Sequence, residues 1–263
     1  NQVPVRRLLF HRGQGGPLRV LYVSYSSMKT KFCLILAVLL STAASLSAQD
    51  SRSFIKERIK EWGSCRSVAL TLKGGDLALT GRNTYAAKGI PEDLRKTLDE
   101  LIDQGEYIED VQLTENGSWL VHYGINGFRW SNIPSLLEKI LKEYYTDLDG
   151  LALLLNSEVV SSVCFNDDGN WILISNERVL SSPDFSEAIE KGTEQNGEVL
   201  TAYMTDDSFV VCYEKGITTF GEIPEKVHNM LKNNKFTIYR LKFLPDGAYF
   251  IADKDGTNYD YYM

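Results

Sequence analysis

The sequence contains few of the residue types that carry out covalent or metal chemistry. Its 263 residues include three histidines and four cysteines, and they do not stand at the close spacing of a metal site. No glycine-rich phosphate loop follows a strand-like segment, and no nucleophile elbow is present. We therefore expect neither a metal nor a cofactor.

Long apolar runs are lacking as well. The segment Phe32–Leu40 is an unbroken apolar run of nine residues, whereas a membrane-spanning helix needs about 20. It follows a lysine-containing start at Met28 and precedes a tail of small residues, which is the pattern of a secretory signal peptide. We expect cleavage before Gln49, export to the periplasm or the extracellular space, and no stable membrane insertion. Residues 1–27 lack a starting methionine and are interpreted as a non-native upstream segment, residues 28–48 as the signal peptide and residues 49–263 as a single repeat domain.

Positive charge is also scarce. The chain holds 28 Lys and Arg residues against 35 Asp and Glu residues. Because residues 1–48 contain six of the basic residues and none of the acidic ones, residues 49–263 carry a net charge of −13. A surface of that charge repels phosphate backbones and anionic lipids. We expect no nucleic-acid partner.

Residues 49–263 contain three cysteines, Cys65, Cys164 and Cys212. An odd number leaves at least one thiol unpaired, and the spacing gives no disulfide framework. Cys164 and Cys212 lie in apolar, strand-like segments. We therefore interpret them as small buried hydrophobic residues rather than as disulfide partners.

What the sequence does have is an internal repeat, the first feature to seek in a chain of this length. Pro91, Pro134, Pro183 and Pro224 each open a helix-like segment with one apolar face. Proline suits the first turn of a helix, where its missing N–H is no loss. A fifth copy without the proline begins near Ser51.

Three short strand-like segments follow each helix. In the second unit they are Ile108–Leu113, Trp119–Tyr123 and Phe128–Trp130. The pair Asn116-Gly117 between the first two strands is a strong hairpin signal. The other units have Gly-Gly, Asp-Gly or Asp-Asp at the same place. The sequence therefore predicts five units of about 42 residues, near 51–90, 91–133, 134–182, 183–223 and 224–263.

The middle strand of each unit is apolar on both faces, as in WLVHY and WILIS. Such a strand must be covered on both sides, and a three-stranded unit cannot bury itself without a stacked neighbour. We predict an α+β repeat protein of five helix-plus-three-stranded β-meander units. Closure into a five-fold, propeller-like ring is favoured because it removes unpaired edges, and a short curved solenoid is the alternative.

The repeated pattern NGxW…YGxNG…IP, which begins at Asn116, resembles a class of secreted bacterial repeat proteins. The segment PDGAYFIADKDG, Pro245–Gly256, is similar in layout to the blades of tachylectin-type five-bladed propellers. That resemblance implies a short helical piece before each blade and a sugar-binding function. The sugar-binding residues of that family do not map onto this sequence position by position.

Aromatic residues follow the first turn of four units at the same position, Trp119, Trp171 and Tyr249 among them. Beside acidic turn residues such as Asp168 and Asp246, these rings could stack on a sugar while the carboxylates accept its hydroxyls. The alternative is that the rings fill gaps between units. We hypothesise ligand-binding roles for Trp119, Trp171, Tyr249, Asp168 and Asp246.

His122 and Cys212 share a middle-strand position that is apolar in the other units. A thiolate beside an imidazolium is what a cysteine nucleophile requires, so this pair supports an alternative function as a Cys/His-dependent hydrolase or transferase of the α/β-propeller type. Without a surrounding motif, we expect two buried core residues. The sequence favours an exported, non-catalytic binding or scaffold module for a protein, peptide or glycan, and it does not define the oligomeric state.

Overall fold

The computed structural model describes residues 49–146 and 158–263. The predicted signal peptide at 28–48 and the upstream segment at 1–27 lie outside the described residues. The chain divides into two compact parts, and all of the described residues belong to the second, Thr42–Met263. Among them, no helix is both long and apolar enough to cross a membrane.

Five antiparallel sheets of three strands each follow one another along the chain, and in every sheet the strands lie in sequence order. The predicted five units are therefore confirmed, and their middle strands are buried almost throughout. The strands are β1 (Ser67–Ala69), β2 (Asp76–Thr80), β3 (Thr84–Lys88), β4 (Ile108–Leu113), β5 (Trp119–Tyr123), β6 (Gly127–Ser131), β7 (Val160–Phe165), β8 (Trp171–Ser175), β9 (Val179–Ser181), β10 (Val199–Met204), β11 (Ser208–Tyr213), β12 (Ile217–Gly221), β13 (Arg240–Phe243), β14 (Tyr249–Ala252) and β15 (Tyr259–Tyr262).

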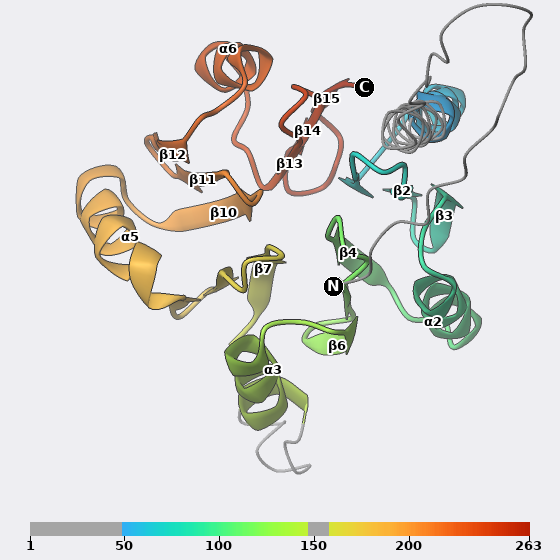
Figure 1. Cartoon of the computed structure of the whole chain (residues 1–263), viewed down its shortest axis with the longest axis horizontal. Coiled ribbons are helices and arrows are strands. Elements are labelled where there is room, and N and C mark those ends of the chain that lie inside the picture. Colours follow the sequence, from blue (N-terminus) through green and yellow to red (C-terminus); the bar gives the residue numbers. More distant parts are fainter. Residues whose placement is uncertain (1–48, 147–157) are drawn as a thin grey trace, which may run out of the picture. The chain divides into compact units, whose positions relative to one another are not determined.

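Helices alternate with the sheets, and Figure 1 shows them on the outer side of the strands. Residues 49–62 are helical. The other helices are α2 (Glu92–Asp103), α3 (Ser135–Leu141), α5 (Pro183–Asn196) and α6 (Glu225–Asn233), and a short π-helix, η1 (Lys142–Thr146), continues α3.

Proline and an apolar stripe explain where each helix begins and which face it buries. Pro134 and Pro224 immediately precede α3 and α6, and Pro183 is the first residue of α5. In α2, which follows Pro91, the buried side chains are leucines spaced at helical intervals. These are Leu94, Leu98 and Leu101.

A tight turn joins the first two strands of each unit. In the second unit the N–H of Thr114 donates to the carbonyl of Ser118 at 2.9 Å, and the N–H of Gly117 donates to the carbonyl of Thr114 at 3.1 Å. Gly117 has a φ of +83°, which side chains rarely adopt. The Asn-Gly pair read from the sequence therefore has the conformational role expected of it.

Neighbouring units pack through their first strands: β4 contacts β1 and β7, and β10 contacts β7 and β13. The last unit also contacts the first, because β13 and β14 both touch β1. One core cluster combines the helix at 49–62, the first sheet and the last sheet, with Ile59, Val68 and Phe250 among its members. Arg52 of that helix forms an ion pair with Asp246.

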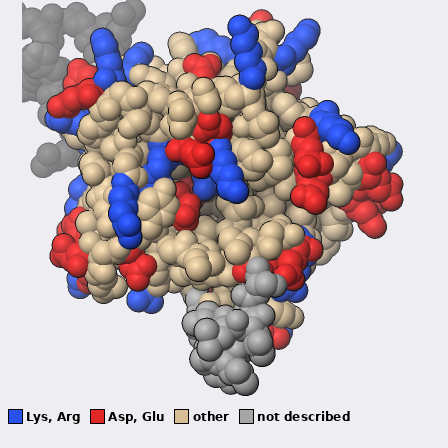
Figure 2. Space-filling model, turned by 180° about the vertical axis from the view of Figure 1, so that it is seen from behind, with Lys and Arg blue, Asp and Glu red and all other residues tan. Residues whose placement is uncertain are grey.

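Charged side chains of both signs are spread over the surface. On the face shown in Figure 2, acidic and basic side chains are interspersed, including around the hollow in the middle of that face. Exposed ion pairs such as Lys96–Glu100, at 3.7 Å, contribute on the order of 0–1 kcal/mol each. The stability of the fold therefore rests on the buried contacts.

Candidate functional site

The structure places the predicted aromatic ligand residues beneath the helices. Trp119 and Trp171 are 4% and 3% exposed. The indole N–H of Trp119 donates to Asp93 of α2 at 3.1 Å, and Trp119 shares a core cluster with Leu94 and Leu98. Because protein atoms cover both indole rings, we place no ligand on them.

In the fourth unit, the aromatic residue after the first turn also contacts a helix. Phe209 of β11 stacks with Phe220 of β12 and meets Phe185 of α5 at a ring-centroid distance of 4.7 Å. In the fifth unit Tyr249 is partly exposed, and its hydroxyl donates to Asp260 at 3.0 Å. In the second and fourth units the aromatic residue therefore attaches a helix to its sheet, a role that burial supports better than sugar stacking.

The two predicted acidic ligand residues do not come together with these rings. Asp168 is exposed in the first turn of the third unit. Asp246 pairs with Arg52 and accepts the N–H of Ala248 at 3.0 Å. Asp246 therefore has a structural role between the last turn and the first helix.

His122 and Cys212 are both buried, at 4% and 2% exposed. A ring nitrogen of His122 (Nε2) lies 3.1 Å from the carbonyl of Ile125, and the ring stacks on Phe128. Burial lowers the pKa of His122 to about 4 and raises the pKa of Cys212 to about 12. A thiolate–imidazolium pair needs the opposite shifts, a lowered thiol pKa and a raised histidine pKa.

Polar side chains that sequence analysis did not select meet between the first strands. Lys242 of β13 is 2% exposed and donates to Asp110 of β4 at 2.9 Å and to the carbonyl of Val111 at 3.3 Å. Asp110 also accepts the hydroxyl of Ser67 at 2.5 Å and the amide of Gln112 at 2.8 Å. The first, second and fifth units thus share one hydrogen-bonded ion pair.

The charges in this group stabilise one another. Burial alone would raise the pKa of Asp110, but the cations of Lys242 and Arg240 hold it below its ordinary value. The ammonium of Lys242 also lies 5.3 Å from the ring centroid of Tyr203. Burial raises the pKa of the neighbouring Cys164 thiol to about 12, so this thiol stays protonated at neutral pH. The group is an ion pair with a neutral thiol beside it rather than a nucleophilic site.

Part of this polar group lies at a position that is polar in every repeat of the sequence. Each first strand has a polar residue directly opposite the middle-strand position that His122 and Cys212 share. A repeated polar position in a buried strand indicates hydrogen bonding between units. The five residues are Ser67, Asp110, Ser162, Thr201 and Arg240.

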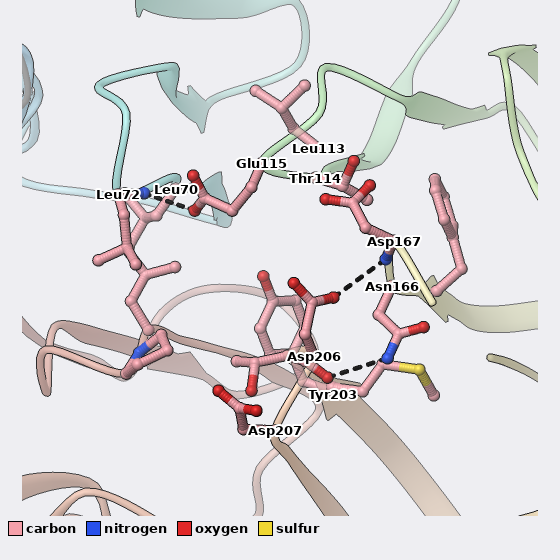
Figure 3. Close-up of a pocket in the computed structure, with 15 residues that line it drawn as sticks. Leu70, Leu72, Leu113, Thr114, Glu115, Asn166, Asp167, Tyr203, Asp206 and Asp207 are labelled. Atoms are coloured by element: carbon pink, nitrogen blue, oxygen red, sulfur yellow. Dashed lines mark hydrogen bonds between the residues drawn. The ribbon is translucent and has the colours of Figure 1, made fainter. Parts of the chain in front are cut away.

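A cavity of about 140 Å³ lies where the first turns of the units meet, and Figure 3 shows its lining. The acidic residues Glu115, Asp167 and Asp206 come from three consecutive units and surround the same space. All five units contribute to the lining: Leu70 and Leu72; Leu113, Thr114 and Glu115; Phe165, Asn166 and Asp167; Tyr203, Met204, Thr205, Asp206 and Asp207; and Leu244 and Pro245.

The acidic residues link each turn to the next. Glu115 accepts the N–H of Leu72 at 2.6 Å, and Asp167 accepts the N–H of Asn116 at 3.0 Å. Asp206 in turn accepts the N–H of Asp167 at 3.1 Å. Each of these three bonds uses one carboxylate oxygen, and Figure 3 shows two of them as dashed lines.

Within the described residues, no ion pair involves the carboxylates of Glu115, Asp167 or Asp206. The ammonium of Lys73 donates to the backbone carbonyl of Glu115 at 2.9 Å. Glu115 Oε2 and Thr114 Oγ1 have no hydrogen-bond partner in this part of the chain, and both atoms are closed off from solvent. Burial raises the pKa of Asp206, the N–H that it accepts from Asp167 lowers it, and the carboxylates of Asp167, Asp168 and Asp207 raise it. A bound cation would relieve this repulsion.

Two units lack the acidic turn residue. Leu72 and Pro245 stand at the turn position that is acidic in the three intervening units. Apolar side chains from all five units line the rest of the cavity, among them Leu70, Phe165 and Leu244. The cavity therefore combines three carboxylates with a largely apolar lining.

Within residues 49–146 and 158–263, no three or more His, Cys, Asp or Glu side chains are grouped so that they could hold a metal ion.

Two solved structures show a low similarity to the chain. No protein-family profile matches the chain, and no curated protein matches it. Among solved structures, the C-terminal domain of gp131 from bacteriophage phiKZ is similar with a TM-score of 0.37 and 10% identity, covering 69% of this chain and 58% of that one. Streptogramin B lyase is similar with a TM-score of 0.26 and 9% identity, covering 71% of this chain and 61% of that one. The chain spans about three fifths of each structure, and similarities this low carry no conclusion about function.

The buried ion pair predicts a large coupling energy between Asp110 and Lys242. Lys242→Met should lower the free energy of unfolding by about 3–5 kcal/mol, because it leaves the Asp110 carboxylate buried without its cation. Adding Asp110→Asn to that variant should restore part of the loss. Urea unfolding of the two single variants and the double variant measures the coupling.

The exposed pair Lys96–Glu100 provides the control for this cycle. Its coupling should be about 0.3–0.5 kcal/mol. A coupling for Asp110 and Lys242 as small as that of the control would contradict a structural role for the buried pair.

Thiol reactivity tests the alternative catalytic function. Native protein at neutral pH should react slowly with iodoacetamide at Cys212, because burial raises the pKa of this thiol to about 12. His122→Leu should leave that rate unchanged, and unfolding in concentrated urea should make all thiols react quickly. Mass spectrometry of the labelled peptides gives the rates. Fast labelling of native Cys212 that depends on His122 would support catalysis instead.

Proposed function

We propose that the protein is a non-catalytic binding module whose ligand presents a positively charged group to the cavity at the first turns. One observation supports this most directly: the carboxylates of Glu115, Asp167 and Asp206, from three consecutive units, line one cavity. The net charge of −7 for the whole chain favours encounter with cationic ligands.

A non-catalytic role agrees with the state of the reactive side chains. Burial raises the pKa of each thiol at Cys65, Cys164 and Cys212 to about 12, which disfavours the thiolate form that a nucleophile needs. Burial also keeps His122 neutral at physiological pH, since its pKa is lowered to about 4. We also propose that the protein is exported, on the basis of the signal-like segment at 28–48.

We propose further that the five units close into a ring rather than form an open solenoid. Contacts of β1 with β13 and β14 support closure. So does the core cluster in which Ile59 of the first helix and Phe250 of the last sheet both take part. Closure would give the cavity a complete wall of five turns, which an open stack does not supply.

Ring closure predicts that a core substitution in the last unit also destabilises the first unit. Phe250→Ala should create a cavity and speed amide exchange in β2 as well as in β14, because both sheets share the cluster that holds Phe250. Leu173→Ala, at a fully buried position of the third unit, is the control. Exchange in β2 that responds no more to Phe250→Ala than to Leu173→Ala would favour the solenoid.

Charge-neutral variants test the proposed binding function. On an immobilised poly-L-lysine surface, the double variant Glu115→Gln and Asp206→Asn should bind about tenfold more weakly than the wild type, a loss of about 1.4 kcal/mol. Both substitutions keep the oxygen that accepts the N–H of the preceding turn. The reduction should therefore report on charge rather than on folding.

A matched control separates a site from general electrostatic attraction. The double variant Asp184→Asn and Asp255→Asn removes the same charge from exposed positions that do not line the cavity. Surface plasmon resonance should show nearly wild-type binding for this control. Equal losses in the two double variants would count against a specific site at the turns.

A further inference from the structure

We propose that Arg52 switches between two carboxylates at the contact between the first and last units. In the structure its guanidinium pairs with Asp246 of the last unit. When Asp76 of the first unit loses its proton, Arg52 transfers to Asp76, and the contact with the last unit loosens. Protonation of Asp76 reverses the change, so mild acid strengthens the contact and neutral pH weakens it. The switch is a property of the fold and does not depend on the proposed ligand.

Two complementary buried atoms at this contact have no partner. Within the part of the chain that the structure describes, the Nε–H of Arg52 and the Oδ2 atom of Asp76 both lack a hydrogen bond. Both side chains contact Thr71. The Nη2 group of Arg52 donates to the carbonyl of Thr71 at 3.3 Å, and the N–H of Thr71 donates to Asp76 at 3.1 Å. A donor and an acceptor that adjoin the same residue, and are both unsatisfied, indicate a second arrangement in which they meet.

The guanidinium is suited to such an exchange because it has donors on more than one edge. In the structure Arg52 bonds to Asp246 through Nη1 and to the carbonyl of Thr71 through Nη2. Its Nε–H is left over. A side-on pair with Asp76 through Nε and Nη2 would give a partner to both of the unsatisfied atoms.

Burial determines which carboxylate holds the cation. Asp76 is 0% exposed, whereas the side chain of Asp246 is 39% exposed. Water can solvate Asp246 after Arg52 leaves, but it does not reach Asp76. An unpaired charge in a buried place costs far more than a partly exposed ion pair contributes. Ionised Asp76 therefore takes Arg52 from Asp246, and protonated Asp76 leaves it there.

The ionisation of Asp76 falls between mild acid and neutral pH. Burial raises the pKa of Asp76 to about 6; the N–H of Thr71, the hydroxyl of Ser51 and the cation of Arg52 lower it, and the carboxylate of Glu115 raises it. The folded-state pKa thus lies above the ordinary value of 3.8. Stability from this raised pKa is fully present below about pH 4 and is lost as the pH rises through about 6. The sign agrees with a contact that is stronger in acid.

The other groups that face Asp76 already have partners. Lys88 lies opposite Asp76 in β3, but its ammonium pairs with Asp50 in the first helix. The hydroxyl of Ser51 donates its proton to the carbonyl of Lys88 at 3.3 Å. Among the described residues, Arg52 is therefore the cation that responds to the charge of Asp76.

The exchange would also alter the cavity at the first turns. Leu72 follows Thr71 in the chain, Pro245 precedes Asp246, and both of these neighbours line the cavity. Arg52 links the two turns in the structure. Its transfer to the first unit removes that link, so the two turns can move apart.

Nuclear magnetic resonance of the wild-type protein tests the switch. The Nε–H signal of Arg52, assigned by its loss in Arg52→Lys, should move between about pH 4.5 and 7.5. Its midpoint should equal that of the carboxyl carbon of Asp76, at about 6. In Asp76→Asn, which keeps an oxygen for the N–H of Thr71, the signal should stay at its acid position. The exposed control Asp255→Asn should titrate like the wild type.

Double-mutant cycles measure the contact itself. The variants Arg52→Met, Asp246→Asn and Asp76→Asn are unfolded with urea at about pH 5 and about pH 7.5. The factor by which Arg52 and Asp246 together change the unfolding constant should be about threefold larger at the lower pH. The factor for Arg52 and Asp76 should change in the opposite direction.

Two results would overturn the inference. An Arg52 signal that does not move with the titration of Asp76 would mean that Arg52 stays with Asp246 whatever the charge of Asp76. An equal coupling of Arg52 with Asp246 at both pH values would mean that the contact does not respond to pH. The titration of the wild-type protein decides the first point even if Asp76→Asn fails to fold.

Discussion

The ion pair between Asp110 and Lys242 constrains the whole arrangement of units. A charge that is almost fully buried must be paired and hydrogen-bonded, because an unpaired one costs several kcal/mol. Asp110 lies in the second unit and Lys242 in the fifth, and Ser67 of the first unit completes the group. Apolar contacts between first strands would tolerate several alignments of neighbouring units. We infer that the polar contacts select the observed alignment, because a shifted one would leave the buried charges of Asp110 and Lys242 unpaired.

The repeat allowed most of the local structure to be predicted from the sequence. The turn pairs such as Asn116-Gly117, the helix-opening prolines and the apolar middle strands each have a local physical cause. They require no knowledge of distant residues. For this reason the limits of β4 and β5 agree with the predicted Ile108–Leu113 and Trp119–Tyr123.

The candidate site was harder to predict because it depends on contacts between units. An aromatic residue after a turn has the same sequence pattern whether it stacks on a ligand or supports a helix. For Trp119, burial and the contact with Asp93 favour the second role. The cavity likewise joins residues more than a hundred positions apart, such as Leu72 and Asp206. The repeated polar position in the first strands was visible in the sequence. Its role became clear only from the contacts of β1 with β4 and β13 in space.

The same carboxylates serve the fold and the candidate site, and this double use explains the character of the cavity. One oxygen each of Glu115, Asp167 and Asp206 holds the preceding turn, which fixes the side chain with little freedom to move away from a ligand. A group fixed in this way loses little conformational entropy on binding. In the first and fifth units Leu72 and Pro245 replace the acid, so the symmetry of the repeat is broken. A cationic ligand would therefore contact carboxylates from the second, third and fourth units only.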